Sequence, residues 1–243
     1  MKKNITLLAL GCCLPLTVSA EQLWSDNSFS VLYGGNYEMI PSGRRGEAHV
    51  LTLEHTSGHS WGSLFFFVDR IQSAKEAYRE TYGELSPNIK LIEVGGFIKR
   101  INAAFTYEFG SSTTRATKQS YSQDNYLAGF GADLDIPGVD LFNVSIYRAQ
   151  DNNVFGKRYD NQLSFSGGWH YGNFIMDGFL DYTPGRNGDN TELNFTPQLT
   201  YNFGPLLGLK NKLKFGIEYA YWRNKFRSDE TQHNAAAIIK WHL

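Results

Sequence analysis

Apolar and polar residues alternate along much of this chain, most regularly in its last third. Residues 192–203 place their apolar side chains on one side and their polar ones on the other, and the same period returns in residues 212–222 and 235–243. Successive side chains of a strand point to opposite faces, so this pattern predicts a sheet with one apolar and one polar face. Each segment is about ten residues long, which is the length that a tilted strand needs to cross a membrane.

Twelve segments show this alternation, cleanly from residue 101 onward and less regularly before it. We therefore predict an all-β fold, a transmembrane antiparallel β-barrel of twelve strands, which forms a single domain over residues 21–243. The predicted strands are residues 28–37, 47–55, 60–70, 90–97, 101–110, 125–134, 142–147, 162–171, 174–182, 192–203, 212–222 and 235–243.

Aromatic residues lie near the ends of the last three segments, on their apolar side. They are Tyr201, Phe203, Tyr219, Tyr221 and Trp241. Rings at these positions are typical of the aromatic girdles that membrane barrels place at the lipid–water interface.

The predicted connections are sorted by length. Those after even-numbered strands are short (56–59, 98–100, 135–140, 172–173, 204–211), and those after odd-numbered strands are longer and polar (111–124, 150–160, 183–190, 223–234). Barrels of the bacterial outer membrane have short periplasmic turns and longer external loops, whereas a soluble sandwich has no reason to sort its loops. We therefore expect the protein in the bacterial cell outer membrane.

The first twenty residues have the features of a signal peptide. Lys2 and Lys3 precede an apolar stretch over residues 5–16, and small residues lead up to Ala20. Both cysteines, Cys12 and Cys13, fall in this segment. The remaining chain therefore has no disulfide or thiol chemistry.

The composition agrees with a membrane barrel and offers no sign of a nucleic-acid partner. The chain has 23 Lys and Arg against 24 Asp and Glu, a formal net charge of −1. The longest apolar run after residue 20 covers only residues 64–68, too few for a membrane helix. Aromatic residues make up 15% of the chain, as expected when only alternate positions face lipid.

The third predicted strand is apolar on both faces and suggests what the inside of the barrel holds. If Leu64, Phe66 and Val68 face lipid, then Phe65 and Phe67 face inward. Rings beside hydrogen-bonding groups could hold a flat solute, or they could simply fill a narrow lumen. The candidate channel residues are the inward aromatic and ionisable ones: Glu54, Trp61, Phe65, Phe67, Asp69, Asp177, Phe179, Asp181, Glu218, Trp222 and Lys225.

Catalysis, metals and cofactors are not expected. His55-Thr56-Ser57 resembles part of the His-x-Ser motif of outer-membrane phospholipases, in which a histidine activates a serine. That motif continues with Asn-Gly, whereas Gly58 and His59 follow here, and we expect His55 to enter a turn. The histidines give no compact ligand set for a metal.

Several short motifs are spread over nearly the whole chain after residue 20. They are Trp24-Ser25-Asp26, Leu53-Glu54-His55, Ser60-Trp61-Gly62, Phe65-Phe66-Phe67-Val68-Asp69, Tyr82-Gly83-Glu84, Gly178-Phe179-Leu180-Asp181, Gly216-Ile217-Glu218-Tyr219, Trp222-Arg223-Asn224-Lys225 and Lys240-Trp241-His242. In this order they resemble the nucleoside-specific channel-forming proteins of the Tsx-like superfamily, especially its OmpK-like branch. The resemblance implies a twelve-stranded barrel with a narrow pore, nucleoside uptake in the named members, and bacteriophage attachment through external loops in several. Leu243 and the Arg44-Arg45 pair depart from the family pattern.

We therefore expect a channel for passive, selective uptake of nucleosides or similar small aromatic solutes, in contact with outer-membrane lipid and lipopolysaccharide. One alternative is a surface barrel with a plugged lumen that acts mainly as a bacteriophage receptor or a structural protein. The other is a lipid-modifying barrel enzyme that uses Ser57.

Overall fold

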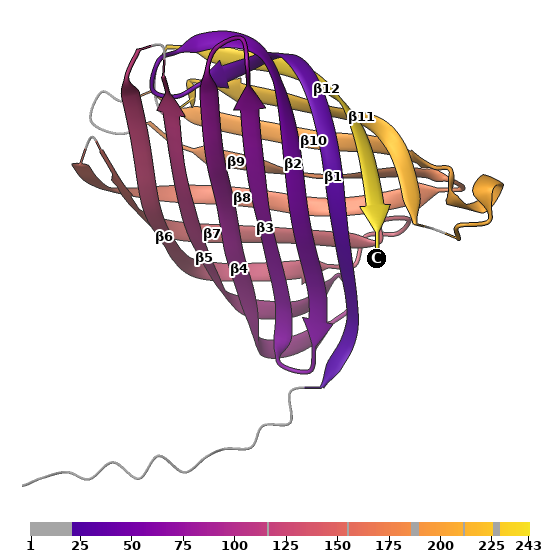
Figure 1. The fold of residues 1–243 in the computed structure, drawn as a ribbon. Coiled ribbons are helices and arrows are strands. Elements are labelled where there is room, and N and C mark those ends of the chain that lie inside the picture. Colours follow the sequence, from indigo (N-terminus) through magenta and orange to yellow (C-terminus); the bar gives the residue numbers. More distant parts are fainter. Residues whose placement is uncertain (1–20, 116, 155, 186–189, 211, 226–228) are drawn as a thin grey trace, which may run out of the picture.

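The computed structural model shows a closed barrel of antiparallel strands (Figure 1) and describes residues 21–115, 117–154, 156–185, 190–210, 212–225 and 229–243. The predicted signal peptide lies outside the described residues. The strands are β1 (Gln22–Met39), β2 (Arg44–His59), β3 (Gly62–Ser73), β4 (Tyr78–Gly95), β5 (Ile98–Thr114), β6 (Gln119–Leu134), β7 (Leu141–Asn153), β8 (Gly156–Tyr171), β9 (Phe174–Thr183), β10 (Glu192–Asn202), β11 (Leu213–Arg223) and β12 (Thr231–His242), with a short 3-10 helix η1 (Gly204–Leu207) before β11.

The first and last strands close the sheet. Ser28 on β1 is paired with Glu54 on β2 at one side and with His242 on β12 at the other. Every strand thus has two neighbours, so the sheet has no open edge with unpaired backbone groups. The predicted twelve-stranded antiparallel barrel is confirmed. Within the described residues, no helix is long and apolar enough to span a membrane.

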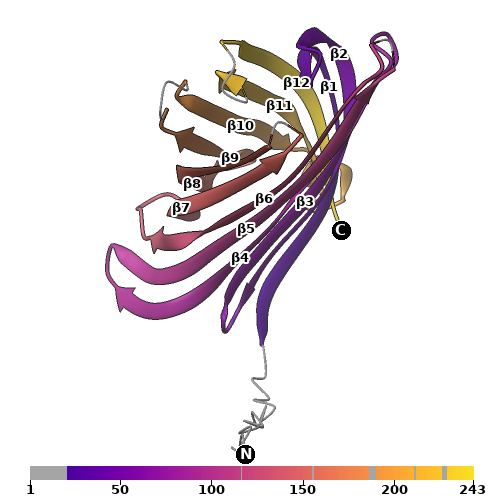
Figure 2. The ribbon, with the colours of Figure 1, turned by 90° about the vertical axis from the view of Figure 1, so that its left-hand side faces the viewer.

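The two ends of the barrel differ. We call the end that holds Gln22 and His242 the proximal end, and the opposite end, which begins with the β1–β2 turn, the distal end. Strands β9–β12 contain ten to twelve residues, whereas β1, β4 and β5 contain seventeen or eighteen. Figure 2 shows the long strands β4 and β5 reaching well beyond the shorter ones.

The predicted sorting of connections by length is wrong. Two expected long loops, residues 111–124 and 150–160, are mostly strand, because β5 continues to Thr114 and β7 continues to Asn153. One of the longer connections, which contains η1, lies at the proximal end instead. The expected turn at residues 56–59 also belongs to β2.

Several strands are longer than predicted for a common physical reason. β4 starts at Tyr78, twelve residues before the predicted start at residue 90. Outside a membrane both faces of a strand meet water, so its outer face no longer needs apolar residues and the two-residue period fades. Strand ends of this kind look like polar loops in the sequence.

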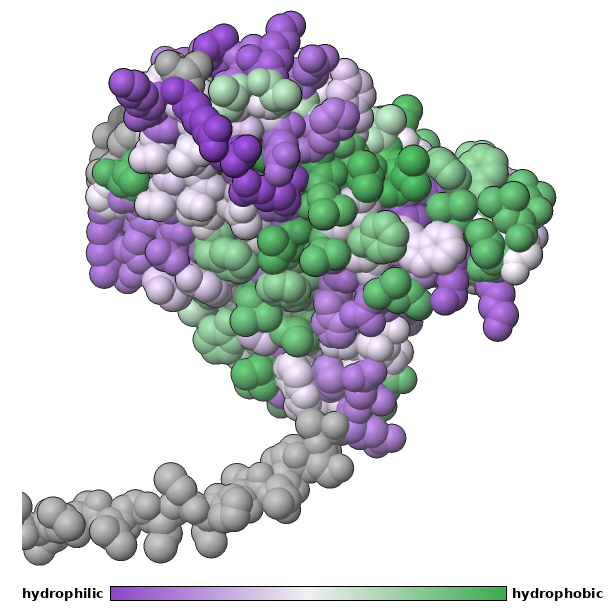
Figure 3. All heavy atoms as spheres, in the orientation of Figure 1, coloured by the Kyte–Doolittle hydropathy of each residue, from purple (hydrophilic) through white to green (hydrophobic). Residues whose placement is uncertain are grey.

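The outer face carries a band of apolar side chains. Phe130, Ile146 and Leu53 expose 62%, 59% and 56% of their surface there. Figure 3 shows apolar residues gathered across the middle of the barrel and hydrophilic ones crowded at the distal end. An exposed apolar band of this extent is expected only where lipid or protein covers it.

The inner face is polar but not uniformly so. Two apolar clusters lie among the inward side chains, one at the β12–β1–β2 closure and one across β5–β7. The bore is thus less hydrophilic than the alternation predicts. The first cluster is Leu32, Val50, Ala236 and Ile238, with Tyr37 and Ile71 packed against it. The second cluster is Ala104, Leu127, Tyr147 and Ala149.

The β1–β2 turn leans across the distal mouth of the barrel. The pairing of β1 with β2 shifts register between Gly34 and Tyr37, and the ends of both strands curve over the top of the barrel in Figure 1. The Ile40 amide donates a hydrogen bond to the Tyr78 hydroxyl (3.3 Å), and the Ser112 hydroxyl donates one to the Ile40 carbonyl. These contacts tie the turn to β4 and β5.

Candidate functional site inside the barrel

A row of inward side chains crosses the wall between β1 and β6. Its members are directly opposite one another on successive strands: Ser28, Glu54, Phe67, Glu84, Glu108 and Asn125. Two carboxylates, Glu84 and Glu108, are therefore neighbours across β4 and β5. Like charges at directly opposite positions destabilise a sheet, and a hydrophobic or neutral residue at either position would remove this repulsion.

Five inward carboxylates form what we call the carboxylate cluster. Charge interactions link Glu84 to Glu108, Asp181 and Asp69, and link Asp69 to Glu218. The cluster brings together β3, β4, β5, β9 and β11, which are far apart in the sequence.

Each carboxylate of the cluster accepts a hydrogen bond from a neutral group. The bonds are Thr52 Oγ1 to Asp69 (2.6 Å), Tyr82 OH to Glu84 (2.6 Å), Asn125 Nδ2 to Glu108 (2.8 Å), Ser164 Oγ to Asp181 (2.6 Å) and Gln198 Nε2 to Glu218 (2.8 Å). No Lys, Arg or His nitrogen of the described residues lies within 4.0 Å of any of these five carboxylates. Each carboxylate is thus held by a neutral donor and keeps further acceptor capacity.

Aromatic rings stand beside the carboxylate cluster. The Phe67 ring centre is 5.7 Å from those of both Phe65 and Tyr82. Tyr82 also donates its hydroxyl to Glu84, so ring faces and carboxylate oxygens share one part of the inner wall. Phe179 lies between Asp177 and Asp181 on β9. This combination can stack on a flat ring and accept hydrogen bonds from its edge.

Most predicted channel residues occupy the inward positions expected for them. The pairing places these nine on the inner face: Glu54, Phe65, Phe67, Asp69, Asp177, Phe179, Asp181, Glu218 and Trp222. Glu54 lies nearer the proximal end, where Lys240 Nζ is 3.5 Å from its carboxylate. Phe66, which follows Phe65, faces outward as predicted.

Trp61 departs from its predicted inward position. It lies in the turn between β2 and β3, where the regular alternation of the strand is lost. Its ring stacks on His59, with ring centres 4.9 Å apart and planes inclined by 12°. Trp61 therefore belongs to the proximal rim and not to the carboxylate cluster.

Trp222 and Lys225 form a second group near the distal mouth. The Trp222 indole donates a hydrogen bond to Glu192 (2.6 Å), and Lys225 Nζ lies 4.5 Å from the Trp222 ring centre. Lys225 Nζ also donates to Gln232 Oε1 at 3.1 Å. Burial lowers the pKa of Lys225, against the opposing effect of nearby carboxylates, of which Glu80 is the strongest.

Three residues of the inner wall were missed by the sequence predictions: Tyr82, Glu84 and Glu108. Tyr82 and Glu84 precede the predicted start of the fourth strand, and therefore no face was assigned to them. The signal was present, because tyrosine and glutamate occupy alternate positions from Tyr78 to Glu84. The alternation of residues 101–110 places Glu108 on the inner face, but it does not show that Glu84 lies opposite.

His55 lies on a strand face, contrary to the predicted turn, and takes part in a hydrogen-bond chain. Its Nδ1 is 2.8 Å from Asn27 Oδ1 and its Nε2 is 3.0 Å from Ser57 Oγ, which is 2.9 Å from His59 Nε2. This resembles a nucleophile, base and orienting group. Ser57 has 0% of its surface exposed and is bonded on both sides, so a substrate carbonyl cannot reach it in this structure.

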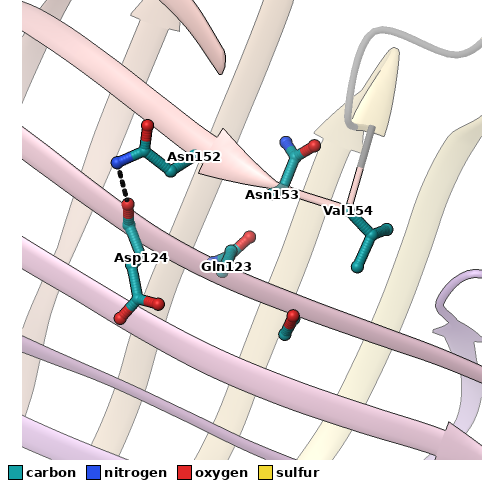
Figure 4. A pocket seen from close by; sticks show the side chains of 6 residues that line it. Gln123, Asp124, Asn152, Asn153 and Val154 are labelled. Atoms are coloured by element: carbon teal, nitrogen blue, oxygen red, sulfur yellow. Dashed lines mark hydrogen bonds between the residues drawn. The ribbon is translucent and has the colours of Figure 1, made fainter. Parts of the chain in front are cut away.

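A shallow polar pocket of about 230 Å³ lies at the distal rim between β6 and β7 (Figure 4). One wall is fixed by the Asn152 amide, which donates a hydrogen bond to the Asp124 carbonyl at 2.9 Å. The Asn152 backbone N–H also donates to Asn125 Oδ1 (3.0 Å), and Asn125 in turn bonds to Glu108, so the pocket borders the carboxylate cluster. Its lining residues are Ser122, Gln123, Asp124, Asn152, Asn153 and Val154.

Comparison with known proteins finds similar solved structures only. No family model matches the chain, and no curated protein matches it. The KdgM porin in complex with disordered oligogalacturonate is 10% identical, with 90% of this chain and 98% of that chain covered and a TM-score of 0.47. The NanC porin is 13% identical (88% and 100% covered, TM-score 0.46), and the translocator domain of autotransporter NalP from Neisseria meningitidis is 12% identical (90% and 88% covered, TM-score 0.47). None of these likenesses identifies a solute or assigns a family.

Proposed function

We propose that the protein is an outer-membrane channel that passes nucleosides or similar small aromatic solutes. The observation that carries this proposal is that carboxylates without a cationic partner within the described residues lie beside aromatic rings on the inner wall. The Phe67 ring packs against the Tyr82 ring, and the Tyr82 hydroxyl donates a hydrogen bond to the Glu84 carboxylate.

Membrane location is supported by the two faces of the wall. The closed sheet pairs its backbone groups internally, which is a requirement for any structure that spans lipid. Its outer face exposes apolar side chains, and its inner face holds most of the strand-borne carboxylates. With an even number of strands both termini lie on one side, so the proximal end is periplasmic and the distal end faces the cell exterior.

The chemistry of the inner wall matches a nucleoside. A base offers two flat faces for stacking and amino or imino groups that donate hydrogen bonds, and a ribose offers hydroxyl donors. Carboxylates that already hold one neutral donor can accept another from such a solute. Contacts of this kind are weak enough to allow release, which passage through a channel requires.

Restricted entry favours selectivity over general diffusion. The β1–β2 turn leans over the distal mouth and is bonded to Tyr78 and Ser112. Trp222 and Lys225 add bulk at the same end. A large hydrated sugar would have to displace these groups, whereas a flat solute presents a smaller cross-section.

A liposome-swelling panel tests the proposal. Proteoliposomes are placed in isosmotic nucleosides, sugars of equal mass and amino acids, and the swelling rates are compared. Nucleosides are expected to enter several-fold faster than the sugars. Equal rates for all solutes would replace the proposal with a general pore, and no swelling with any solute would favour a plugged barrel whose loops serve as a bacteriophage receptor.

A further inference from the structure

Cationic side chains of the strands gather on the outer face of the barrel near its distal end. They are Arg70, Arg79, Arg148, Lys157 and Arg223. Arg70 is paired with Leu51, and Arg148 follows Ile146 by two positions; both of these neighbours are exposed on the outer face. Arg79, Arg148, Lys157 and Arg223 are themselves exposed, and Arg70 is half-exposed. We call these five residues the outer cation belt.

The outer cation belt has no carboxylate partners. Within the described part of the chain, none of its members forms an ion pair within 4.0 Å. Arg70 instead donates to Thr81 Oγ1 (2.8 Å), and Arg148 donates to Asn161 Oδ1 (3.1 Å). Arg148 Cζ lies 5.6 Å from the Tyr159 ring centre, and Lys157 Nζ lies 5.2 Å from it.

Two carboxylates on the same face bond to tyrosines and not to the belt. Glu47 accepts a hydrogen bond from the Tyr33 hydroxyl (2.9 Å), and Asp124 accepts one from the Tyr107 hydroxyl. Since neither pairs with a member of the outer cation belt, the belt can receive an external anion. The inner face has the opposite character, since its carboxylate cluster faces the lumen.

Arg70 and Arg79 lie close together on the neighbouring strands β3 and β4. Arg70 is opposite Thr81, and Arg79 is opposite Gln72, so the two arginines are diagonal neighbours on adjacent strands. Diagonal neighbours are roughly 7–8 Å apart, a distance that two long arginine side chains can close around one phosphate. Arg70 also lies two positions beyond Val68 of the apolar band, where lipid headgroups begin.

We propose that Arg70 and Arg79 bind a phosphate group of a phosphorylated glycolipid in the outer leaflet of the membrane. Arginine binds phosphate with two parallel hydrogen bonds, and basic residues at a membrane surface attract anionic lipid. A lipid is favoured over a soluble anion because the pair lies directly beside the apolar band that acyl chains would cover. This inference rests on the proposed membrane location but not on the proposed solute.

The test measures lipid binding to the folded protein in detergent by native mass spectrometry. The probes are bisphosphoryl lipid A, the same lipid with both phosphates removed, and inorganic phosphate. The variant is Arg70→Gln with Arg79→Gln. Lys99→Gln is the matched control, because Lys99 is an exposed cation at the proximal end. Folding of each variant is checked by heat-modifiable mobility on gels, which also reports barrel formation independently of lipid or solute binding.

Bisphosphoryl lipid A is expected to bind at least tenfold more tightly than the dephosphorylated lipid. The double variant should lose this difference, and Lys99→Gln should retain it. Equal binding of the two lipids, or unchanged binding by a correctly folded double variant, would overturn the proposal. Displacement of the lipid by millimolar inorganic phosphate would also overturn it, since the site would then be one for a soluble anion.

Discussion

Glu84 and Glu108 are directly opposite each other on β4 and β5, and both side chains point into the barrel. A pair of like charges at directly opposite positions destabilises a sheet relative to a neutral pair. Tyr82 and Asn125 each donate a hydrogen bond to one of the two carboxylates, and neither carboxylate has a cationic partner within the described residues. The arrangement therefore lowers stability and, in return, leaves acceptor oxygens facing any solute inside the barrel.

Neutralising this pair should change ion selectivity without harming the fold. The double substitution Glu84→Gln with Glu108→Gln keeps side-chain shape and removes the like-charge repulsion, so the unfolding free energy should stay equal or rise by up to about 1 kcal/mol. The wild-type channel should prefer K⁺ to Cl⁻, and the variant should lose most of this preference. Reversal potentials across a planar bilayer with a KCl gradient measure it.

Asp124→Asn is the matched control for the selectivity measurement, because the Asp124 side chain lies on the outer face and bonds to Tyr107. Its reversal potential should equal that of the wild type. Because screening shortens the range of a charge to about 3 Å in 1 M salt, the wild-type preference should also weaken there. An unselective wild-type channel at 0.1 M KCl would show that the carboxylate cluster does not face the conduction path.

Two adjacent phenylalanines provide a test of stacking. Phe67 faces inward against Phe65 and Tyr82, whereas Phe66 faces outward. Base–aromatic stacking contributes about 1–3 kcal/mol per base, so Phe67→Ala should reduce the preference for nucleosides over sugars several-fold. Phe66→Ala should keep the preference. Uptake of a labelled nucleoside and a labelled sugar into proteoliposomes gives the ratio, and equal ratios for both variants would exclude stacking at Phe67.

The β1–β2 turn should restrict the distal mouth through two hydrogen bonds. Tyr78→Phe with Ser112→Ala removes both bonds to Ile40, each of which contributes about 0.5–1.5 kcal/mol. With the turn released, single-channel conductance should rise, and sugars should gain more permeability than nucleosides. Conductance equal to that of the wild type would mean that the turn does not limit entry.

The hydrogen-bond chain through Ser57 should be structural. Ser57→Ala leaves the Nε2 atoms of His55 and His59 without their partner, which should cost about 1–3 kcal/mol of unfolding free energy. Ser60→Ala, in the neighbouring turn, is the control. Lipid turnover by the wild-type protein should equal the protein-free background. Ester hydrolysis that disappears in Ser57→Ala would instead assign a catalytic role.

The inward residues could be predicted only where a clear two-residue period fixed the face of the strand. Asp181 was placed correctly because Leu180 and Tyr182 marked the outer face of its strand, whereas Phe67 lies on a strand that is apolar on both faces and was placed inward only by assigning Phe66 and Val68 to the lipid side. Glu84 was missed because Gly83 and Pro87 occupy outward positions of β4 on either side of Leu85 and interrupt the two-residue period. Its closeness to Glu108 depends on the register of two strands, which the alternation does not determine.

Turn and rim residues were harder to predict for a different reason. Trp61 was assigned inward by continuing the alternation of the third strand, but the turn after β2 breaks that alternation before Gly62, and the ring stacks on His59. The lean of the β1–β2 turn over the mouth results from a register shift after Gly34, together with contacts to residues on β4 and β5. Neither feature leaves a local signal in the sequence.

The most direct test of the central claim is the K⁺ current through single barrels in a planar bilayer while adenosine is added to the distal side. Adenosine should reduce the current in a concentration-dependent, saturable way, and a sugar of similar mass should not, because only the nucleoside can stack on Phe67 while donating to the carboxylate cluster. A barrel that carries no current, or whose current responds equally to both solutes, would contradict the account.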